Sequence, residues 1–431
     1  MPEPYYHSLR FDTTRCNACM SCMRACPTQA IRVRSGRAVM LEDRCIDCGE
    51  CLKVCTRDAV VPLTGLLAEL SRFKYTVAIP SPALYTQFDG GVKPAAVHEA
   101  LRHCGFDAVA GLSQSCALVT AAIEFYLAEF RGGFPVISSF CPTVVRLIQV
   151  KYPALLDQLL PILSPREVTA REVKRATAER FGLDLRRIGT VYVTPCPSKM
   201  VSIVDHPGQD SSHIDSAVSI SDLFPHLVAA VQDAQAAVPA AEAGETESAS
   251  SLGWALSRGL AASLPAEDTM SVAGLPNVVR ILDDIEQGRL RHYTFVECHA
   301  CSEGCVSGVL TVANPYVARV RAIRLMQSLG EGPPLDGDAV RRRYHAGEFH
   351  MGLRIGARPM RPLHDTISGA IARMKERERL AATLPGIDCG ACGAPSCTAF
   401  ADDVVRGEAD EDWCVFVRQR QIEAAVPALA A

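Results

Sequence analysis

The sequence predicts an α/β protein with mostly parallel strands, flanked by two cysteine-rich modules. Three short apolar runs, at residues 134–138, 191–193 and 293–296, have the length of buried strands. From Phe73 onward such runs alternate with amphipathic helices, which is the pattern of parallel α/β domains. Each of the three runs precedes a cysteine-containing loop, and the residues concerned are Cys141, Cys196, Cys301 and Cys305. Because functional sites in open α/β sheets lie beyond the carboxyl ends of strands, we expect these thiols to gather at one edge of a sheet.

The chain divides into four predicted segments. Residues 1–64 contain eight cysteines and few core residues, whereas residues 73–330 carry the α/β pattern. Residues 331–380 predict a helical connector, and residues 381–420 contain the last cysteine group. Within the α/β segment, residues 236–251 are rich in Ala, Glu, Ser and Thr and predict a flexible insertion.

One helix start within the α/β segment is well marked. Ser164 can serve as the N-cap, Pro165 as the first helical residue, and Glu167 as the partner that completes a capping box. These residues predict a helix that begins at Pro165.

Composition and charge exclude several function classes. A net charge of −4 over 431 residues gives no general attraction for nucleic acid. No apolar stretch reaches the roughly 18 residues of a membrane-spanning helix, so we expect none. The first residues lack the basic and apolar regions of a secretory signal, and we expect a cytoplasmic protein. Nineteen cysteines in such a chain indicate metal ligands rather than disulfides.

The first cysteine group has the spacing of two [4Fe–4S] clusters. In each of two runs the cysteines are separated by two, two and three residues. Three close cysteines then bind one cluster while the fourth reaches the other cluster. The predicted ligand sets are Cys16, Cys19, Cys22 and Cys55 for one cluster, and Cys45, Cys48, Cys51 and Cys26 for the other. Zinc fits two such runs poorly. The pair is an electron relay and implies an electron carrier or redox partner protein.

The last cysteine group predicts one more metal site, on Cys389, Cys392, Cys397 and Cys414. Gly390 and Gly393 allow a tight loop around a cluster, and a helix can span residues 398–405. Four cysteines also suit tetrahedral zinc, which stays an alternative. Residues 388–397 resemble the small [4Fe–4S] modules of corrinoid iron–sulfur proteins and of electron-transfer subunits in anaerobes. This resemblance favours [4Fe–4S] over zinc.

Residues 75–325 resemble the catalytic domain of [FeFe] hydrogenases. Three loops carry the resemblance: Ser-Ser-Phe-Cys-Pro at 138–142, Thr-Pro-Cys-Pro-Ser-Lys at 194–199, and Glu-Cys-His-Ala-Cys-x3-Cys at 297–305. Flanking stretches also match, at residues 78–83, 152–153 and 163–165. The resemblance implies a two-lobed H-cluster domain with parallel sheets, preceded by a bacterial-type dicluster ferredoxin domain and followed by a small helical Fe–S module.

The resemblance also implies a cofactor. This is a [4Fe–4S] cluster on the four central cysteines, with Cys305 bridging to a diiron unit that carries CO, cyanide and a dithiolate. Lys199 matches the family lysine that hydrogen-bonds a cyanide, and a charge-assisted bond to an anionic ligand is a strong one. Ser81 and Pro82 would line the diiron pocket, and Phe140 adjoins the first cluster ligand. The implied substrates are H2 and protons.

The departures from the family concern proton delivery. Phe140 stands where active enzymes have a proton-transferring cysteine, and its side chain has no proton to move. Ser202 replaces a glutamate of the second loop. Of two acidic relay positions upstream, one is Ala121 and the other is Glu124. A positioned acid contributes on the order of 10² to 10⁴ in rate, so we expect a slow enzyme.

Thr194 and His299 stand at two positions where the family usually has methionines that pack on the diiron unit. His299 could act as a substitute acid because histidine titrates near neutrality. A packing or hydrogen-bonding role for His299 is the favoured interpretation. Cys298 lies off the ligand pattern and is interpreted as a packing residue, with a local proton or redox role as the alternative.

Three functions follow from these observations. The departures and the extra cysteine module resemble the sensory branch of the family, which predicts slow H2 binding or sensing. Because the chain stops at Ala431, its output would pass to a separate signalling partner. The alternative is an electron-transfer Fe–S protein without a diiron site, against which Lys199 and the pocket loop argue. A fast hydrogenase would need a proton relay that the sequence does not contain.

Overall fold

The computed structural model describes residues 5–65, 67–89, 91–237, 247–265, 268–332 and 334–429. The chain forms two compact units, which we call the central unit (residues 1–8 and 63–357) and the cysteine-rich unit (residues 9–62 and 358–431). The predicted four-segment division stays a prediction. Most of the expected insertion, residues 238–246, lies outside the described residues.

The central unit is an α/β structure with two parallel sheets. The first sheet has the strand order β6-β5-β8-β9, with β5 Tyr75–Pro80, β6 Ala108–Val109, β8 Ile188–Thr194 and β9 Ser216–Ser219. The second has the order β10-β11-β7, with β7 Val136–Ile137, β10 Thr269–Ala273 and β11 Phe295–His299. All seven residues of β8 are buried, as expected for a strand covered on both faces.

The two sheets correct one expectation from the sequence. The three apolar runs do form strands, but β8 belongs to the first sheet, whereas β7 and β11 belong to the second. The four central cysteines therefore do not gather at the edge of a single sheet. Apolar runs of this kind indicate burial and length, but they do not say which strands pair with each other.

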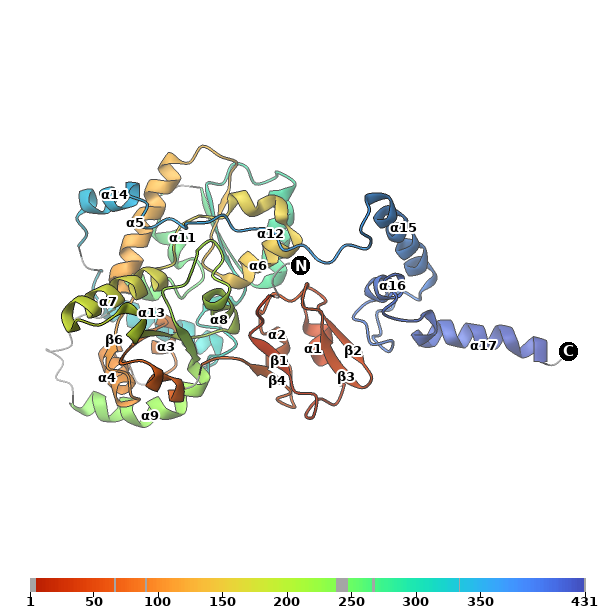
Figure 1. The fold of residues 1–431 in the computed structure, drawn as a ribbon, viewed down its shortest axis with the longest axis horizontal. Helices are drawn as coiled ribbons and strands as arrows, with labels where there is room; N and C mark the ends of the chain where they lie inside the picture. Colours follow the sequence, from red (N-terminus) through yellow and green to blue (C-terminus); the bar gives the residue numbers. More distant parts are fainter. Residues whose placement is uncertain are drawn as a thin grey trace. The chain divides into compact units, whose positions relative to one another are not determined.

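Helices cover both sheets of the central unit (Figure 1). They are α3 Pro82–Tyr85, α4 Pro94–His103, α5 Ser113–Glu129, α6 Pro142–Lys151, α7 Pro165–Phe181, α8 Pro197–Val204, α9 Ile220–Ala237, α10 Ala249–Gly253, α11 Gly259–Ser263, α12 Leu275–Glu286, α13 Pro315–Ser328 and α14 Gly337–His345. Short 3-10 helices span Leu67–Arg72, Pro153–Gln158 and Leu185–Arg187, and β12 spans Ser302–Cys305. Helices α4 and α9 pack side by side, and their buried residues share one core with β5 and β8.

Proline and a tertiary contact together set the start of α7. The helix begins at Pro165, as predicted, because a proline at the first position lacks only an N–H that would have no partner there. The predicted capping box is wrong. Ser164 makes no side-chain cap bond, and the Glu167 carboxylate instead accepts from Ser212 Oγ at 2.7 Å and from the His213 N–H at 2.8 Å.

The cysteine-rich unit joins the first and last parts of the chain. Its N-terminal part has two antiparallel pairs, formed by β1 Leu9–Phe11 with β4 Val60–Pro62 and by β2 Ile31–Arg34 with β3 Arg37–Met40. Its short helices are α1 Ser21–Ala25 and α2 Glu50–Lys53. The C-terminal part contains α15 Ile367–Thr383, α16 Cys397–Val405, a 3-10 turn at Glu411–Trp413 and α17 Val415–Leu429. Helix α16 confirms the helix predicted over residues 398–405.

No helix among the described residues is both long and apolar enough to cross a membrane.

Candidate functional site

The four central cysteines come from both lobes of the central unit. Cys141 follows β7 and precedes α6, and Cys196 follows β8 and precedes α8. Cys301 lies between β11 and β12, and Cys305 is the last residue of β12. The site is therefore assembled from loops that follow strands of both sheets.

Lys199 on α8 connects these thiols. Its Nζ lies 3.4 Å from Cys305 Sγ and 3.9 Å from Cys196 Sγ, and its charge also acts on the Cys141 thiol. Burial opposes the charged ammonium, but the thiols of Cys196 and Cys305 raise the pKa of Lys199 well above its usual value. A buried cation thus lies within 4 Å of the Cys196 and Cys305 sulfurs, and its charge lowers the pKa of the Cys305 thiol.

Cys305 is held as a thiolate. Burial raises the pKa of this thiol, but the Lys199 charge and a hydrogen bond from His299 lower the pKa to about 6. The thiolate is the form that binds metal. Of the central cysteines, Cys305 is the one that the resemblance assigns to the bridge, and its surroundings suit that position.

A cavity of about 680 Å³ opens beside Cys141 and Cys305. Five residues predicted from the sequence line it: Ser81, Pro82, Phe140, Lys199 and His299. Ser81 caps α3 after β5, which directs this loop toward the cavity. Glu124 is half-buried on α5, about two turns beyond Cys116, which does line the cavity. The set of lining residues in the described part of the chain does not contain Glu124.

Phe140 contributes to an aromatic wall. Its ring packs edge-on against Trp254, with 4.9 Å between the ring centroids. Both side chains line the cavity. Where the family has a proton-transferring cysteine, this chain therefore presents apolar surface to the interior.

His299 is anchored by a buried carboxylate. Its Nε2 lies 2.8 Å from Glu297 Oε1, and Glu297 Oε2 accepts from the Ala261 N–H at 3.0 Å. Burial lowers the pKa of His299, but hydrogen bonds with Cys305 and Glu297 raise the pKa to about 10. His299 is thus held in the charged form between the Cys305 thiolate and the Glu297 carboxylate.

Arg166, Trp254 and Glu297 are among the cavity residues that sequence reasoning missed. Arg166 donates from Nη2 to Ser202 Oγ at 2.6 Å and from Nη1 to the Lys199 carbonyl at 3.3 Å. It follows directly after the matched Ser164–Pro165 stretch, so its position was a usable signal. Trp254 had no such signal, because it lies outside every matched loop.

The cysteine-rich unit brings its predicted ligand sets together. Cys16, Cys19, Cys22 and Cys55 line one hollow of about 370 Å³. In the second set, the charges of Cys26 and Cys51 act on Cys48. Backbone N–H groups point at sulfur in both sets, from Ala38 to Cys16 Sγ at 3.4 Å and from Ala30 to Cys26 Sγ at 3.2 Å. Such bonds to cluster sulfurs help to set reduction potentials.

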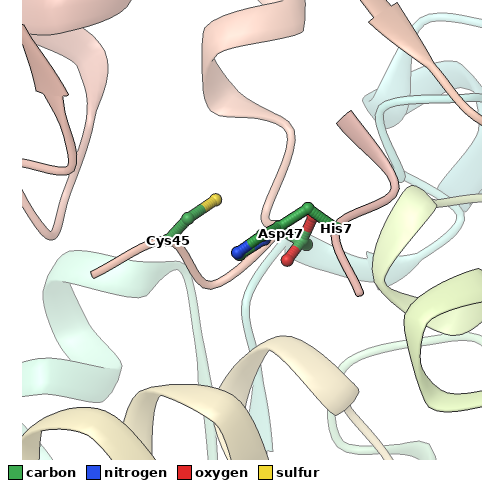
Figure 2. A group of neighbouring side chains, drawn as sticks. All are labelled: His7, Cys45 and Asp47. Atoms are coloured by element: carbon green, nitrogen blue, oxygen red, sulfur yellow. The ribbon is translucent and has the colours of Figure 1, made fainter. Parts of the chain in front are cut away.

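Asp47 is an acidic neighbour of the second set. It lies two residues after Cys45 on the segment before α2, and Figure 2 labels both side chains. Burial, and after it the Asp47 carboxylate, raise the pKa of the Cys45 thiol. A metal that binds here must therefore displace a firmly held proton.

A second hollow of the cysteine-rich unit, of about 300 Å³, is lined by all four predicted C-terminal ligands. Gly390 and Gly393 both have positive φ, at 78° and 76°, as a tight cysteine loop requires. Ligation by the sixteen cysteines stays a prediction. In the cysteine-rich unit, two of the predicted ligand sets each line one hollow with all four cysteines.

Three family models match different stretches of the chain. The family model described as iron only hydrogenase large subunit, C-terminal domain, matches residues 74–264 and 259–309. A 4Fe-4S dicluster model matches residues 8–56, and an Fe-S cluster model matches residues 384–416.

Two curated relatives and one solved structure are similar to the chain. Iron hydrogenase 1 of Clostridium pasteurianum is 24% identical over 375 residues, covering 70% of this chain and 64% of the relative. The NADP-reducing hydrogenase subunit HndD of Solidesulfovibrio fructosivorans is 25% identical over 222 residues, covering 44% of this chain and 38% of the relative. This chain thus spans less than two thirds of either relative. The [FeFe]-hydrogenase HydA1 of Chlamydomonas reinhardtii aligns with a TM-score of 0.49 and 18% identity, covering 68% of this chain and 98% of that chain.

Proposed function

We propose, from the premise that this chain belongs to the iron-only, or [FeFe], hydrogenase family, that it binds H2 at the central cysteine site and turns it over slowly. The cysteine-rich unit would carry electrons between this site and a redox partner protein. Slow turnover suits a sensor, whose output would pass to a separate signalling protein.

The size of the central cavity carries this proposal. A plain [4Fe–4S] cluster needs little more than its four thiols, and the hollows of the other two outlined sets measure about 370 and 300 Å³. The central cavity is larger than either of these hollows, and Cys141, Cys305 and Lys199 line it together. This extra room fits a group larger than a cubane, attached through Cys305.

The residues around the cavity suit the diiron group of an H-cluster. Cys141, Cys196, Cys301 and Cys305 would hold its cubane. Lys199 is charged and buried, and it would donate a charge-assisted hydrogen bond to an anionic ligand of that group. When bound, the group would supply the metal centre at which H2 is split into protons and electrons.

The aromatic wall supports slow turnover. Phe140 packs against Trp254 and has no proton to transfer, and Glu124 is not among the described residues that line the cavity. We propose His299 as a hydrogen-bond donor that positions Cys305, because its ring contacts both that thiol and Glu297. His299 and Glu124 remain the candidates for any residual proton transfer.

The same wall favours a second candidate function, electron transfer without a diiron site. A site with no route for protons can still exchange electrons. In that case the central cysteines would hold a cubane alone, and the remaining space in the cavity would have no role.

Infrared spectroscopy of the anaerobically matured full-length protein tests the proposal. We expect CO and cyanide bands that shift under H2. Iron counting gives an independent check, since four cubanes alone contain about sixteen irons and a diiron unit adds two. Absence of the bands in protein that contains about sixteen irons would establish the electron-transfer alternative.

A further inference from the structure

Within the cysteine-rich unit, the C-terminal cysteine loop is joined to the ferredoxin part by backbone contacts. The Val33 N–H in β2 donates to the Gly393 carbonyl at 2.9 Å. A Cβ atom on Gly393 would lie 2.0 Å from the Val33 carbonyl oxygen. The loop that carries Cys392 therefore lies against the edge of β2, so close that only glycine fits.

Side chains of the ferredoxin part bind the same loop. Arg34 donates to the Cys392 carbonyl and Arg24 to the Cys389 carbonyl, both at 3.1 Å. A Cβ on Gly390 would lie 3.0 Å from Met23 Cε and 3.5 Å from Met20 Sδ. Two of the four predicted C-terminal ligands are thus held through their own carbonyl groups.

A buried ion pair fixes the helix that follows the loop. Asp403 on α16 accepts two bonds from Arg32, at 2.6 and 2.9 Å, and both side chains are at most 3% exposed. Asp402 pairs with Arg44 at 2.5 Å and with Arg406 at 2.9 Å. An Arg–carboxylate pair with two parallel bonds fixes geometry more strictly than a single contact. These contacts define the position of the C-terminal cysteine site on the ferredoxin part.

The contacts lead to one particular ligand set. Val33, which bonds to Gly393, also lines the hollow of Cys16, Cys19, Cys22 and Cys55. Across the hairpin Val33 pairs with Ala38, whose N–H points at Cys16 Sγ. Met20, beside Gly390, lines the same hollow. The cysteine loop thus reaches this set through one intervening strand residue.

We infer that the β2 edge and the Arg32–Asp403 pair seat the C-terminal cysteine site against the Cys16/Cys19/Cys22/Cys55 site, so that the two form an adjacent redox pair. Asp403 and Gly393 are its positioning residues. An iron–sulfur group bound in each site would supply one-electron chemistry. The inference does not rest on hydrogen chemistry at the central site, and it stands or falls separately from the infrared test.

Electron paramagnetic resonance of the full-length, iron-loaded and chemically reduced protein tests this pairing. We expect a magnetic interaction between the C-terminal cluster and one N-terminal cluster. Cys414→Ser, which removes a C-terminal ligand, should abolish that interaction and leave the second N-terminal cluster unchanged. An N-terminal spectrum that Cys414→Ser leaves unaltered would overturn the inference, and so would zinc in the C-terminal site.

Two glycines of the module provide a matched pair of variants. Gly393→Ala places a methyl group against the Val33 carbonyl, whereas Gly407→Ala introduces the same kind of backbone strain, at φ 73°, with no atom within 4 Å. We expect Gly393→Ala to weaken the magnetic interaction while iron content is kept, and Gly407→Ala to leave the interaction as in the parent. Equal spectra for the two variants would contradict the inference.

If Gly393→Ala does not assemble its clusters, Asp403→Asn carries the test. The substitution keeps the shape of the side chain and removes the charge that Arg32 binds. We expect a weaker magnetic interaction, with Asp410→Asn, an exposed position in the same module, as the unaffected control. An interaction equal to that of the parent in Asp403→Asn would overturn the positioning role.

Discussion

The central site and the sites of the cysteine-rich unit use the same ligand and differ in everything around it. In the cysteine-rich unit, sulfurs sit in small hollows and receive backbone N–H groups from Ala30 and Ala38. In the central unit, a buried lysine faces the sulfurs and a larger cavity opens beside them. Four thiols suffice to hold a cubane. Added charge and space are what make a site suitable for a further group and a small substrate.

Removing Cys305 should break this comparison most severely. Cys305→Ala deletes the thiolate that Lys199 and His299 both contact, so we expect complete loss of the central group. Iron content should fall by about six, counting one cubane and one diiron unit, while the N-terminal cluster signals persist. Cys298→Ala is the matched control, because Cys298 is buried beside the same loop and is not a predicted ligand. Equal losses in both variants would show that the loop had simply misfolded.

Phe140→Cys tests whether the aromatic wall limits turnover. A thiol at this position can move a proton where a phenyl ring cannot, and we expect H2 oxidation to rise by on the order of 10²-fold. The rate is measured with a one-electron dye in matured protein. Phe140→Ala opens the same space without a proton donor. If it accelerates turnover equally, access rather than proton transfer was limiting.

Lys199→Met should weaken the central group without deleting a ligand. The variant keeps most of the volume and removes the charge that lowers the pKa of Cys305, so the thiol holds its proton more firmly. We expect the affinity for the central group to fall by on the order of 10- to 100-fold. Occupancy is read from the cyanide bands. Lys174→Met, which breaks an ion pair with Asp215 elsewhere in the unit, should leave those bands intact.

The two units should also respond differently to acid. Burial, with the nearby Arg102 charge, lowers the pKa of His98 in the central unit to about 4. A lowered pKa stabilises the fold above the unfolded value near 6.5, and this stability is lost as pH falls from there toward 4. The loss is on the order of 3 kcal/mol. In the cysteine-rich unit, burial opposes ionisation of Asp402, but Arg44 and Arg406 lower its pKa below 3.8, so that contribution is lost only at lower pH.

Single-tryptophan variants separate these responses. The chain has two tryptophans, Trp254 in the central unit and Trp413 in the cysteine-rich unit. Replacing one tryptophan at a time with Phe gives two variants, and each variant keeps a single fluorescent probe in a different unit. We expect the Trp254 transition to shift to lower denaturant between pH 6.5 and 4, and His98→Phe to remove that shift. A Trp254 transition that does not move over this range would contradict the assignment to His98.

Short-range sequence spacing predicted most of the candidate metal ligands. Cysteines separated by only a few residues can reach one cluster whatever the rest of the chain does, so Cys16, Cys19 and Cys22 could be grouped from the sequence, and so could Cys389, Cys392 and Cys397. The strands that end near Cys141 and Cys196 were also recognisable, because buried strands need apolar runs of a certain length. The resemblance supplied Lys199, Ser81 and Pro82, and each of them lines the cavity.

Long-range pairing was decided by the tertiary structure. Nothing in the runs before Cys141 and Cys196 says that their strands belong to different sheets, since pairing depends on which chain segments meet after folding. For the same reason the Glu167 carboxylate does not form the predicted capping box, because it accepts hydrogen bonds from Ser212 and His213. Trp254 reached Phe140 across 114 residues of chain (254 − 140), and Asp403 reached Arg32 across a separation of 371. The sequence by itself determined which atoms could bind metal, and the tertiary structure decided what surrounds them.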